Sequence, residues 1–271
     1  MNESKESLQK AIEESSEVLD KFEEWIATKK HIPKNIPRSV LIRYYHTKQN
    51  DLEEAKKFLE ENVKFRLKHP FYFTDRRLDT EEFRRSIKLF QLIECPKLTK
   101  EKNHITIFRI KNPDVNNFVI KEIIKTFFMV QDMCAVEAPK INQNIFIYDA
   151  KGATVKHFMK LVTNLSTILH FLYYEENYIH VDILNNHFVN CSPILNKVIN
   201  LVSPFLKKES VDSMVFHSSF NTLHEYVDKE CLPIEYGGNF GTLDEFHEIN
   251  LKQLFKHRDY LGKKENFVLT N

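Results

Sequence analysis

Hydrophobic residues near the amino terminus recur at three- and four-residue steps, the spacing that lines one face of a helix. The pattern predicts three successive helices, over about 5–28, over about 38–49, and from Asp51 to about Pro70. Asp51 is expected to cap the third helix, with Glu54 three positions later as its partner. Residues 1–75 are therefore expected to form a small helical bundle.

Beyond this region, apolar runs rich in β-branched residues alternate with helical periodicity. The predicted order is a polar helix over 80–91, a strand over 104–110, a helix over 118–136, a strand over 145–149, a helix over 154–176, a strand over 187–190, a helix over 193–206 and a strand over 214–217. Strands joined by helices predict a largely parallel sheet with helical crossovers. The fold class is therefore expected to be α/β.

The helix predicted over 193–206 carries an unusually large apolar face. Its face is formed by Ile194, Leu195, Val198, Ile199, Leu201, Val202, Phe205 and Leu206. A helix with this face must lie against something apolar. Two interpretations fit the pattern: a permanent wall of the core, or a lid over a cavity that holds an apolar ligand.

Composition narrows the class of protein. With 271 residues, 42% of them hydrophobic, the chain can bury a sizeable core. Its 39 basic and 38 acidic residues nearly cancel, which argues against a nucleic-acid partner. Neither a secretory signal nor an apolar run of about 18 residues is recognisable, so we expect a cytoplasmic protein. The four widely spaced cysteines are expected to be reduced thiols without a disulfide or zinc site.

Signatures of common enzymes are missing from the sequence. No glycine-rich loop links a strand to a helix, and no hydrolase elbow or metal-binding histidine pair is present. His187 and His217 are expected to be satisfied core or pocket-rim groups, and Asp149 to cap the turn after its strand. The turn at Gly237 and Gly238 is expected to be structural. We therefore expect neither catalysis nor a cofactor.

Five segments in order carry a family resemblance. They are Leu41–Tyr45 followed by Asn50–Ala55, then Ile147–Gly152, His187–Asn190, Ser203–Leu206 and Leu232–Gly238. Together they resemble successive signatures of the CRAL-TRIO (Sec14-like) lipid-binding family, over roughly residues 10–245. The similarity is greatest to members of the tocopherol-transfer type, including an insect branch.

This resemblance implies a domain plan and a role for the apolar helix. Residues 1–75 would be the amino-terminal helical bundle, 76–245 the CRAL-TRIO domain, and 246–271 a carboxyl-terminal tail. In this family a largely parallel sheet floors an apolar cavity, which a mobile amphipathic gate helix closes. The resemblance therefore favours a lid over a wall for the helix at 193–206.

The resemblance also implies which residues would contact a bound ligand. They are Ile123, Thr126, Val130, Tyr148, Phe171, Tyr174, Val181 and Ile183, with Leu195, Ile199 and Val202 from the gate. Most are apolar, as a buried lipid requires. Thr126 and Tyr148 would supply hydrogen bonds that orient a polar head group.

One departure from the family concerns its basic patch for phosphoinositides. Asp182 and Leu184 stand where a lysine and an arginine are usual, and Glu209 and Ser213 occupy later basic positions. Acidic groups repel phosphates, which argues against phosphoinositide-driven release.

The function that the resemblance implies is a carrier of one small hydrophobic molecule, of the tocopherol, retinoid, carotenoid or other isoprenoid type. Such a carrier would be a monomer that touches membranes only transiently, during loading or release. Two alternatives are Sec14-type exchange of phospholipid or phosphatidylinositol, and a protein-interaction adaptor in trafficking.

Overall fold

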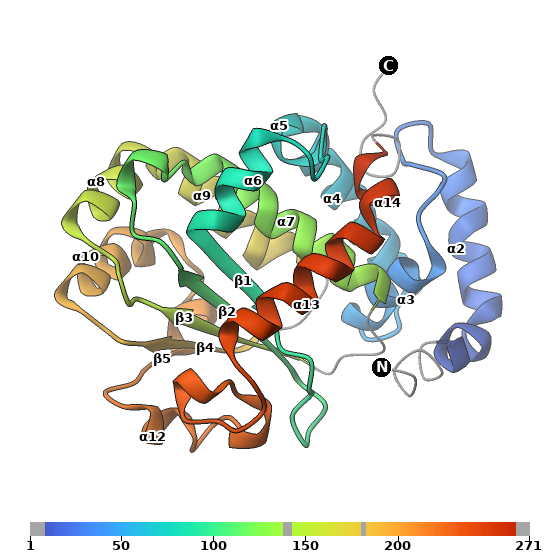
Figure 1. The fold of residues 1–271 in the computed structure, drawn as a ribbon. Helices are drawn as coiled ribbons and strands as arrows, with labels where there is room; N and C mark the ends of the chain where they lie inside the picture. Colours follow the sequence, from blue (N-terminus) through green and yellow to red (C-terminus); the bar gives the residue numbers. More distant parts are fainter. Residues whose placement is uncertain (1–8, 138–142, 180–182, 264–271) are drawn as a thin grey trace.

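The computed structural model describes residues 9–137, 143–179 and 183–263. Near the amino terminus, α2 (Ser16–Thr28), α3 (Arg38–Thr47) and α4 (Leu52–Lys68) lie together at one end of the molecule (Figure 1). Leu19, Phe22, Leu41 and Leu59 are fully or almost fully buried between them. Asp51 caps α4 as predicted, because its Oδ1 accepts hydrogen bonds from the backbone N–H groups of Glu53 and Glu54 at 2.9 and 3.1 Å.

The described residues form a five-stranded sheet in the order β1-β2-β3-β4-β5. Its strands are β1 (Phe90–Glu94), β2 (His104–Ile110), β3 (Asn144–Asp149), β4 (Ile183–Val189) and β5 (Met214–Phe216). β1 pairs with β2 in antiparallel fashion, and the other neighbours are parallel. The expected α/β fold with a largely parallel sheet is confirmed.

Several predicted elements have different bounds in the structure, among them the helix predicted over 193–206, which ends at Val202. The helix predicted over 80–91 ends at Leu89, and the next five residues form β1, because pairing with β2 outweighs local helical periodicity. β4 begins at Ile183 rather than at His187. The helix predicted over 154–176 is two helices, α8 (Val155–Thr163) and α9 (Leu165–Tyr178), which meet at Asn164.

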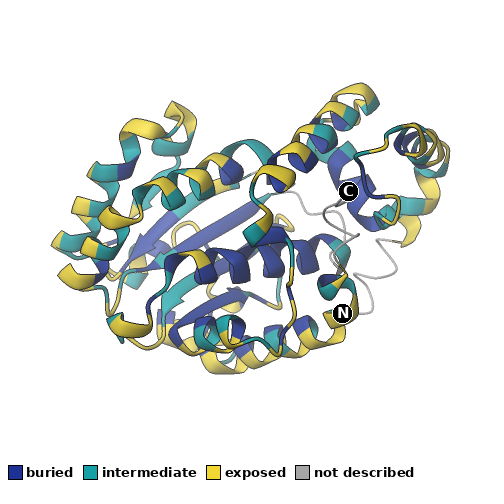
Figure 2. Ribbon diagram, turned by 90° about the horizontal axis from the view of Figure 1, so that it is seen from above, coloured by how far each residue is buried: buried dark blue, intermediate teal, exposed yellow. Residues whose placement is uncertain are grey.

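The two faces of the sheet bury different sets of side chains. Ile93, Ile105, Ile107, Ile145 and Ile147 point to one face, where they pack under the carboxyl-terminal segment. That segment includes α12 (Phe220–Leu223) and reaches the turn before α13 (Leu243–Lys256). The opposite face carries aromatic side chains and packs against α7 (Ile120–Glu137) and α9. Figure 2 shows the sheet and α7 as the buried centre of the molecule.

A compact turn follows α12 and ties the carboxyl-terminal segment to the sheet. Gly237 has a left-handed backbone with φ of 73°, and a Cβ added at Gly238 would lie 2.0 Å from the carbonyl oxygen of Leu232. Tyr236, between them and the sheet, donates its hydroxyl to Asp149 at 2.9 Å. The predicted structural role of these glycines is confirmed.

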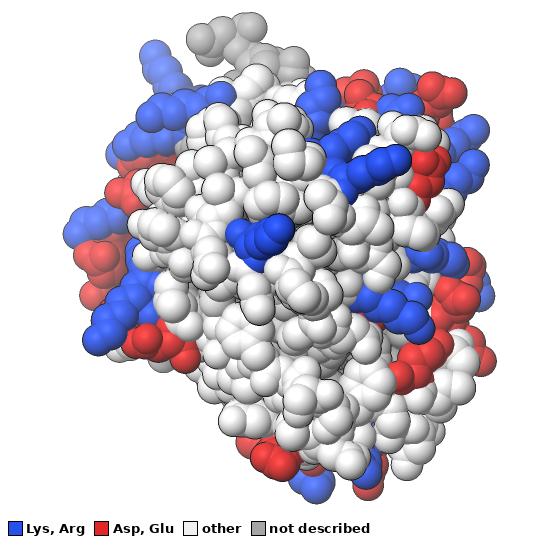
Figure 3. All heavy atoms as spheres, turned by 90° about the vertical axis from the view of Figure 1, so that its left-hand side faces the viewer, with Lys and Arg blue, Asp and Glu red and all other residues white. Residues whose placement is uncertain are grey.

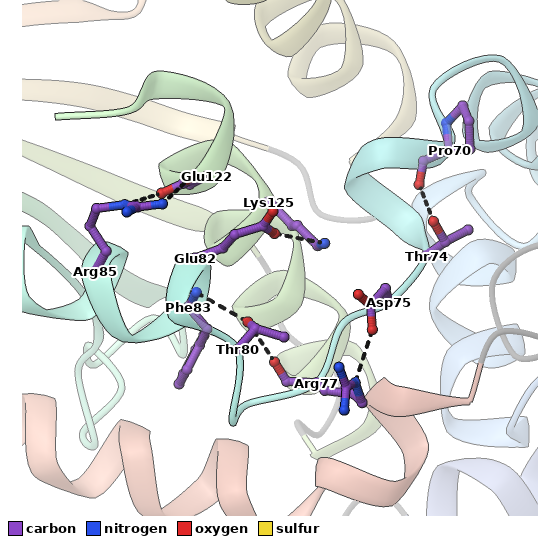
Figure 4. A network of polar contacts seen from close by, with 10 residues as sticks. All are labelled: Pro70, Thr74, Asp75, Arg77, Thr80, Glu82, Phe83, Arg85, Glu122 and Lys125. Atoms are coloured by element: carbon purple, nitrogen blue, oxygen red, sulfur yellow. Dashed lines mark hydrogen bonds and ion pairs between the residues drawn. The ribbon is translucent and has the colours of Figure 1, made fainter. Parts of the chain in front are cut away.

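The short helices α5 (Pro70–Phe73) and α6 (Glu81–Leu89) connect the bundle to the sheet. Arg85 of α6 makes a bidentate pair with Glu122 of α7 at 2.7 and 2.8 Å, and Lys125 of α7 lies 3.3 Å from Glu82 (Figure 4). Thr80 caps α6 through a hydrogen bond from the Phe83 N–H. These contacts hold α6 along α7.

A buried ionic network joins the amino-terminal bundle to the rest of the molecule. Arg66 of α4 binds both oxygens of Asp132 on α7 at 2.8 and 3.0 Å, and Arg76 binds the same carboxylate at 2.6 Å. Tyr174 of α9 accepts from Arg66 at 2.8 Å. The bundle is therefore connected to α7 and α9 through buried polar contacts as well as apolar packing.

The segment 246–271, which the sequence suggests is a tail, contains most of α13 and all of α14 (Arg258–Gly262). Leu254 and Leu261 of these helices are buried in the same core as α7. Asn250 of α13 pairs with the backbone of Glu94 in β1 through two hydrogen bonds. The described part of this segment thus packs as an integral layer against β1 and α7.

Between β4 and β5 the chain forms α10 (Pro193–Val202), a short 3-10 turn at Ser203–Phe205, and α11 (Lys208–Asp212). Other 3-10 turns lie at Val115–Asn117, Lys229–Cys231 and Ile234–Tyr236. Within the residues that the structure describes, no helix is both long and apolar enough to cross a bilayer.

Candidate functional site

An apolar cavity of about 310 Å³ lies between the aromatic face of the sheet and the helices α7, α8, α9 and α10. Phe108, Tyr148 and Phe188 project from adjacent strands as its floor. Their rings pack together, with Tyr148 stacked 5.0 Å from Phe188 and edge-on 6.0 Å from Phe108. The volume falls within the range of small-molecule binding pockets, and the walls are mostly apolar.

Helix α10 covers this cavity without packing into the core. Ile194, Leu195, Val198 and Ile199 line the cavity, yet each is only half-buried. Val202 is the buried residue of the helix, and α8 is its main neighbour among the helices. Pro193 occupies the first turn, where its missing N–H costs no hydrogen bond. This arrangement matches the lid interpretation, because a helix in a solid core would bury its apolar stripe.

Seven of the eleven predicted ligand-contact residues line the cavity. They are Ile123, Tyr148, Phe171, Ile183, Leu195, Ile199 and Val202. They come from α7, α9, two strands and α10. The fold therefore brings together side chains from position 123 to position 202, which are 79 residues apart in the sequence.

Three other predicted positions lie elsewhere, and Val181 falls outside the described residues. Thr126 and Val130 line a separate cavity of about 20 Å³ on the side of α7 that faces α13. That volume holds about one water molecule, so Thr126 is not placed to orient a ligand head group in the large cavity. The Tyr174 hydroxyl is engaged by Arg66 and Asn62 in the ionic network.

Asp149 lies in the wall of the cavity, but its hydrogen-bonding capacity is used by the fold. Its Oδ1 accepts from the Lys151 N–H at 2.9 Å and from Asn190 Nδ2 at 2.7 Å. Its Oδ2 accepts from the Tyr236 hydroxyl. The prediction that this carboxylate caps the turn after β3 is confirmed.

Two other polar side chains in the wall have unused atoms. His157 of α8 is 3% exposed; its Nδ1 completes the cap of the helix with Thr154, while its Nε2 has no partner among the described residues. Glu175 of α9 is 7% exposed, and neither of its carboxyl oxygens has a partner there. Burial lowers the pKa of His157 and raises the pKa of Glu175 well above its ordinary value.

The position of Glu175 in the sequence already marks it as unusual. It lies four residues after Phe171 and seven after Ile168, which places all three on one face of α9. An acid on an otherwise apolar helical face is unusual, because burying it costs free energy. His157 had no comparable signal, since its position under α10 depends on the crossover.

A groove of about 440 Å³ adjoins the cavity at Glu175. Glu175, Glu176, Ile183, Asn186 and Ser210 line both spaces. The groove lies between α3, α4, the end of α9 and α11, and so opens between the bundle and the segment after the gate.

The positions at which the family resemblance expects basic groups can be located around this groove. Glu209 and Ser213 line it with Lys48 and Lys207, whereas Asp182 lies outside the described residues. Lys48 lies over the Phe58 ring at 3.9 Å. Lys207 donates to the Glu176 carbonyl at 3.1 Å and to Asn177 Oδ1 at 2.9 Å. Both lysines of the groove are therefore engaged by the protein itself.

His187 and His217 lie on the other face of the sheet, away from the cavity. His187 Nδ1 and His217 Nε2 are 2.8 Å apart, and His217 Nδ1 lies 3.0 Å from the Thr222 hydroxyl. Burial, with a smaller effect of His217, lowers the pKa of His187 to about 4. The pair joins β4 to the end of β5 inside the core, as predicted for core histidines, but His187 Nε2 has no hydrogen-bond partner among the described residues, so this histidine is only partly satisfied.

Comparisons with known proteins give matches over both parts of the chain. The family model described as CRAL/TRIO domain matches residues 93–238, more than half of the chain, and that described as Pinta-like, UBA domain matches 11–83. Over 146 residues the chain is 25% identical to alpha-tocopherol transfer protein-like of Homo sapiens, covering 52% of this chain and 41% of that protein. It is 23% identical to clavesin-2 of Mus musculus over 143 residues, covering 52% of this chain and 43% of that protein.

A solved structure matches over a larger share of the chain. The crystal structure of Sfh5 aligns with a TM-score of 0.50 and 14% identity, covering 82% of this chain and 81% of that one. At 14% identity, the match supports a similar fold and says nothing about function. The sequence matches to the two curated relatives span less than half of either relative's length.

Proposed function

Because this chain belongs to the CRAL/TRIO domain family, we propose that it is a carrier that binds one small lipophilic molecule beneath α10 and transfers it. The observation that carries the proposal is the apolar cavity of about 310 Å³ under a helix whose apolar stripe is only half-buried. The family comprises lipid carriers rather than enzymes. Binding and release require no covalent chemistry, only movement of the covering helix.

The lining of the cavity supports a ligand that is mostly hydrocarbon. The floor is aromatic and the cover is aliphatic, so burying a ligand here removes apolar surface from water on both sides. Polar groups are few and lie at particular points of the wall, which suits a molecule with one polar end. Tocopherols and retinoids have this character, and carotenoids and other isoprenoids share the largely hydrocarbon body.

The end of the molecule that carries α8 and α10 is suited to brief contact with a membrane. Val155 and Met159 of α8 are 57% and 52% exposed, and Phe205 after α10 is 58% exposed. Figure 3 shows this end as a broad uncharged surface with a few lysine or arginine side chains on it. The exposed apolar side chains of this end can enter the interface of a bilayer while the gate helix opens.

The groove argues against a carrier of phosphoinositides. Its two lysines are engaged by protein groups, and the acidic side chains of Glu176 and Glu209 border the same space. The acidic border would repel a phosphate head group. An adaptor function without a ligand would leave the hollow beneath α10 unexplained.

Filling the cavity tests the proposal. Ile199→Trp places a large side chain in the cavity, and Asn200→Trp places the same side chain on the exposed side of the same helix. We expect the first variant to weaken binding of a fluorescent tocopherol or retinoid at least about tenfold, since the indole competes for the ligand's volume. Binding of the Asn200→Trp variant should stay near that of the wild type.

The measurement is a fluorescence titration, together with native mass spectrometry of protein purified from its own source. A stoichiometric lipophile that is present on the wild type and lost in Ile199→Trp supports a dedicated carrier. The carrier proposal is contradicted if the wild-type protein binds no lipophile in the titration and carries none in the mass spectrum.

A further inference from the structure

We propose that Glu175 is the head-group residue of the cavity and selects lipophiles whose polar end donates a hydrogen bond, an alcohol or an amine, over those that end in carboxylate or phosphate. The inference rests on the proposed function and adds the chemical class of its ligand. It begins with the position of Glu175 where the cavity meets the groove, a point from which one side chain can reach the end of a bound ligand.

Glu175 differs from the other buried acids of the molecule. Asp132 is paired with Arg66 and Arg76, Glu122 with Arg85, and Asp149 accepts three hydrogen bonds. Among the side chains that the structure describes, Glu175 is the buried acid whose two oxygens both have no partner. Burying an unpaired acid costs several kcal/mol unless it stays protonated or another group pairs with it.

The fold itself gains nothing from an acid at this position. Glu175 lies in the last turn of α9, where the partial negative charge of the helix end disfavours a carboxylate. The nearest basic groups of the groove, Lys48 and Lys207, are directed to Phe58 and to Glu176 and Asn177. A leucine here would continue the apolar face formed with Ile168 and Phe171, so the acid is better explained by a group that enters the cavity.

The chemistry of that group follows from the surroundings of the carboxyl. Burial raises the pKa of Glu175 well above its usual range and so favours the protonated carboxyl. A protonated carboxyl both donates and accepts, which matches an alcohol; an ionised one pairs with a protonated amine. A carboxylate or phosphate would meet Glu176 and Glu209 at the same end, where Lys48 lies over the Phe58 ring and Lys207 is hydrogen-bonded to Glu176 and Asn177.

Asn186 and Ser210 complete the polar end of the cavity beside Glu175. Asn186 donates to the Ser213 hydroxyl at 2.9 Å, which fixes its amide between β4 and the end of α11. These neutral groups can form hydrogen bonds with a head group, but they do not discriminate between head groups of different charge. Glu175 is therefore the residue on which the discrimination depends.

The experiment uses the full chain and a matched series of probes, namely dodecane, dodecanol, dodecylamine, dodecanoate and dodecyl phosphate, below their aggregation limits, in competition with a fluorescent lipophile. Wild type is compared with Glu175→Gln, Glu175→Leu and the control Glu248→Gln, which removes an exposed charge on α13. We expect wild type and control to bind dodecanol or dodecylamine at least about tenfold more tightly than the two anions.

The two substitutions separate the alcohol from the amine. Glu175→Gln still donates and accepts, so it should keep an alcohol preference and lose an amine preference, whereas Glu175→Leu should lose both. Urea unfolding shows whether Glu175→Leu is folded. We expect its unfolding midpoint to equal or exceed that of the wild type, because the substitution removes a buried unpaired acid.

Equal ranking of the probes in wild type and Glu175→Leu would overturn the role of Glu175, and so would tighter binding of either anion by the wild type. In those cases dodecane and the fluorescent lipophile still bind, and the carrier function survives. If no probe binds the wild type, the proposed function itself fails.

Discussion

Asp149 and Glu175 are acids in the wall of one cavity, and their partners give them opposite roles. Asp149 accepts hydrogen bonds from a backbone N–H, an amide and a tyrosine, so it holds β3 to the turn after it and to the carboxyl-terminal segment. Glu175 has no partner among the described residues and faces the hollow. Both side chains are carboxylic acids and both are buried; the local supply of hydrogen-bond donors distinguishes the acid that supports the fold from the one that is available to a ligand.

At the same scale, the buried pair His187 and His217 should make stability depend on pH. The folded protein holds His187 neutral with a pKa of about 4, against 6.5 for an ordinary histidine, so the unfolded chain binds more protons below pH 6.5. The stability due to the neutral form is therefore complete above about pH 6.5 and is lost as pH falls toward 4. Between about pH 7.5 and about pH 5 we expect a loss on the order of 2 kcal/mol.

The measurement is urea unfolding of the wild type and of His187→Leu at both pH values. Removing the imidazole should make the difference between the two conditions markedly smaller, whatever its effect on absolute stability. A variant whose stability falls as steeply with acid as that of the wild type would show that other groups cause the loss.

At the scale of elements, α10 and α7 contact the same cavity but differ in their support. α7 is buried along most of its length between the sheet, α9 and the bundle, whereas α10 has one buried residue and lies on α8. Figure 2 shows the helices at that end as intermediate or exposed, in contrast to the buried α7. Opening α10 therefore disrupts less apolar packing than opening α7.

Hydrogen exchange should detect this difference. In protein stripped of ligand, we expect amides of α10 to exchange at least roughly tenfold faster than those of α7, which corresponds to about 1.4 kcal/mol less opening free energy. A bound lipophile should slow exchange in α10 because it supplies the missing apolar contacts. Equal protection of α10 and α7 without a ligand, measured by mass spectrometry, would indicate a fixed wall instead of a gate.

At the scale of the whole molecule, the amino-terminal bundle and the sheet-containing part share one buried ionic network. Asp132 of α7 is the common acceptor for Arg66 of α4 and for Arg76, and its carboxylate is almost fully buried. The pairing offsets part of the cost of burying two guanidinium groups. The relative position of the bundle, which forms one side of the groove beside the cavity, therefore depends on a few side chains from distant parts of the chain.

Asp132→Asn should be strongly destabilising for this reason. The asparagine is nearly isosteric but removes the buried carboxylate that both guanidinium groups bind, and we expect a loss of about 3–5 kcal/mol in the free energy of unfolding. Asp75→Asn is the matched control, because it removes one acid from an exposed pair with Arg77 and should cost less than about 1 kcal/mol. Urea unfolding measures both; similar small losses would mean that the network contributes little.

Much of the fold follows from local pattern. The helical bundle, the alternation of strands with helices and the amphipathic stripe of α10 all depend on periodicities of 3.6 and 2, which a sequence displays directly. The cap at Asp51 and the turn at Gly237 and Gly238 depend on single residues with strong backbone preferences. The family resemblance of the segments also predicted seven of the residues that line the cavity.

Tertiary structure decided the features that depend on partners from elsewhere in the chain. Phe90–Glu94 became a strand because β2 pairs with it, and α13 and α14 became a packed layer because β1 and α7 offer an apolar surface. The resemblance implies that Thr126 contacts a ligand, whereas the structure places it in the small cavity beside α13, because matched segments do not specify which neighbour each side of a helix meets. Whether a buried acid such as Glu175 has a hydrogen-bond partner depends on which donors folding brings close to it. The sequence alone does not give the distance between the carboxyl and those donors.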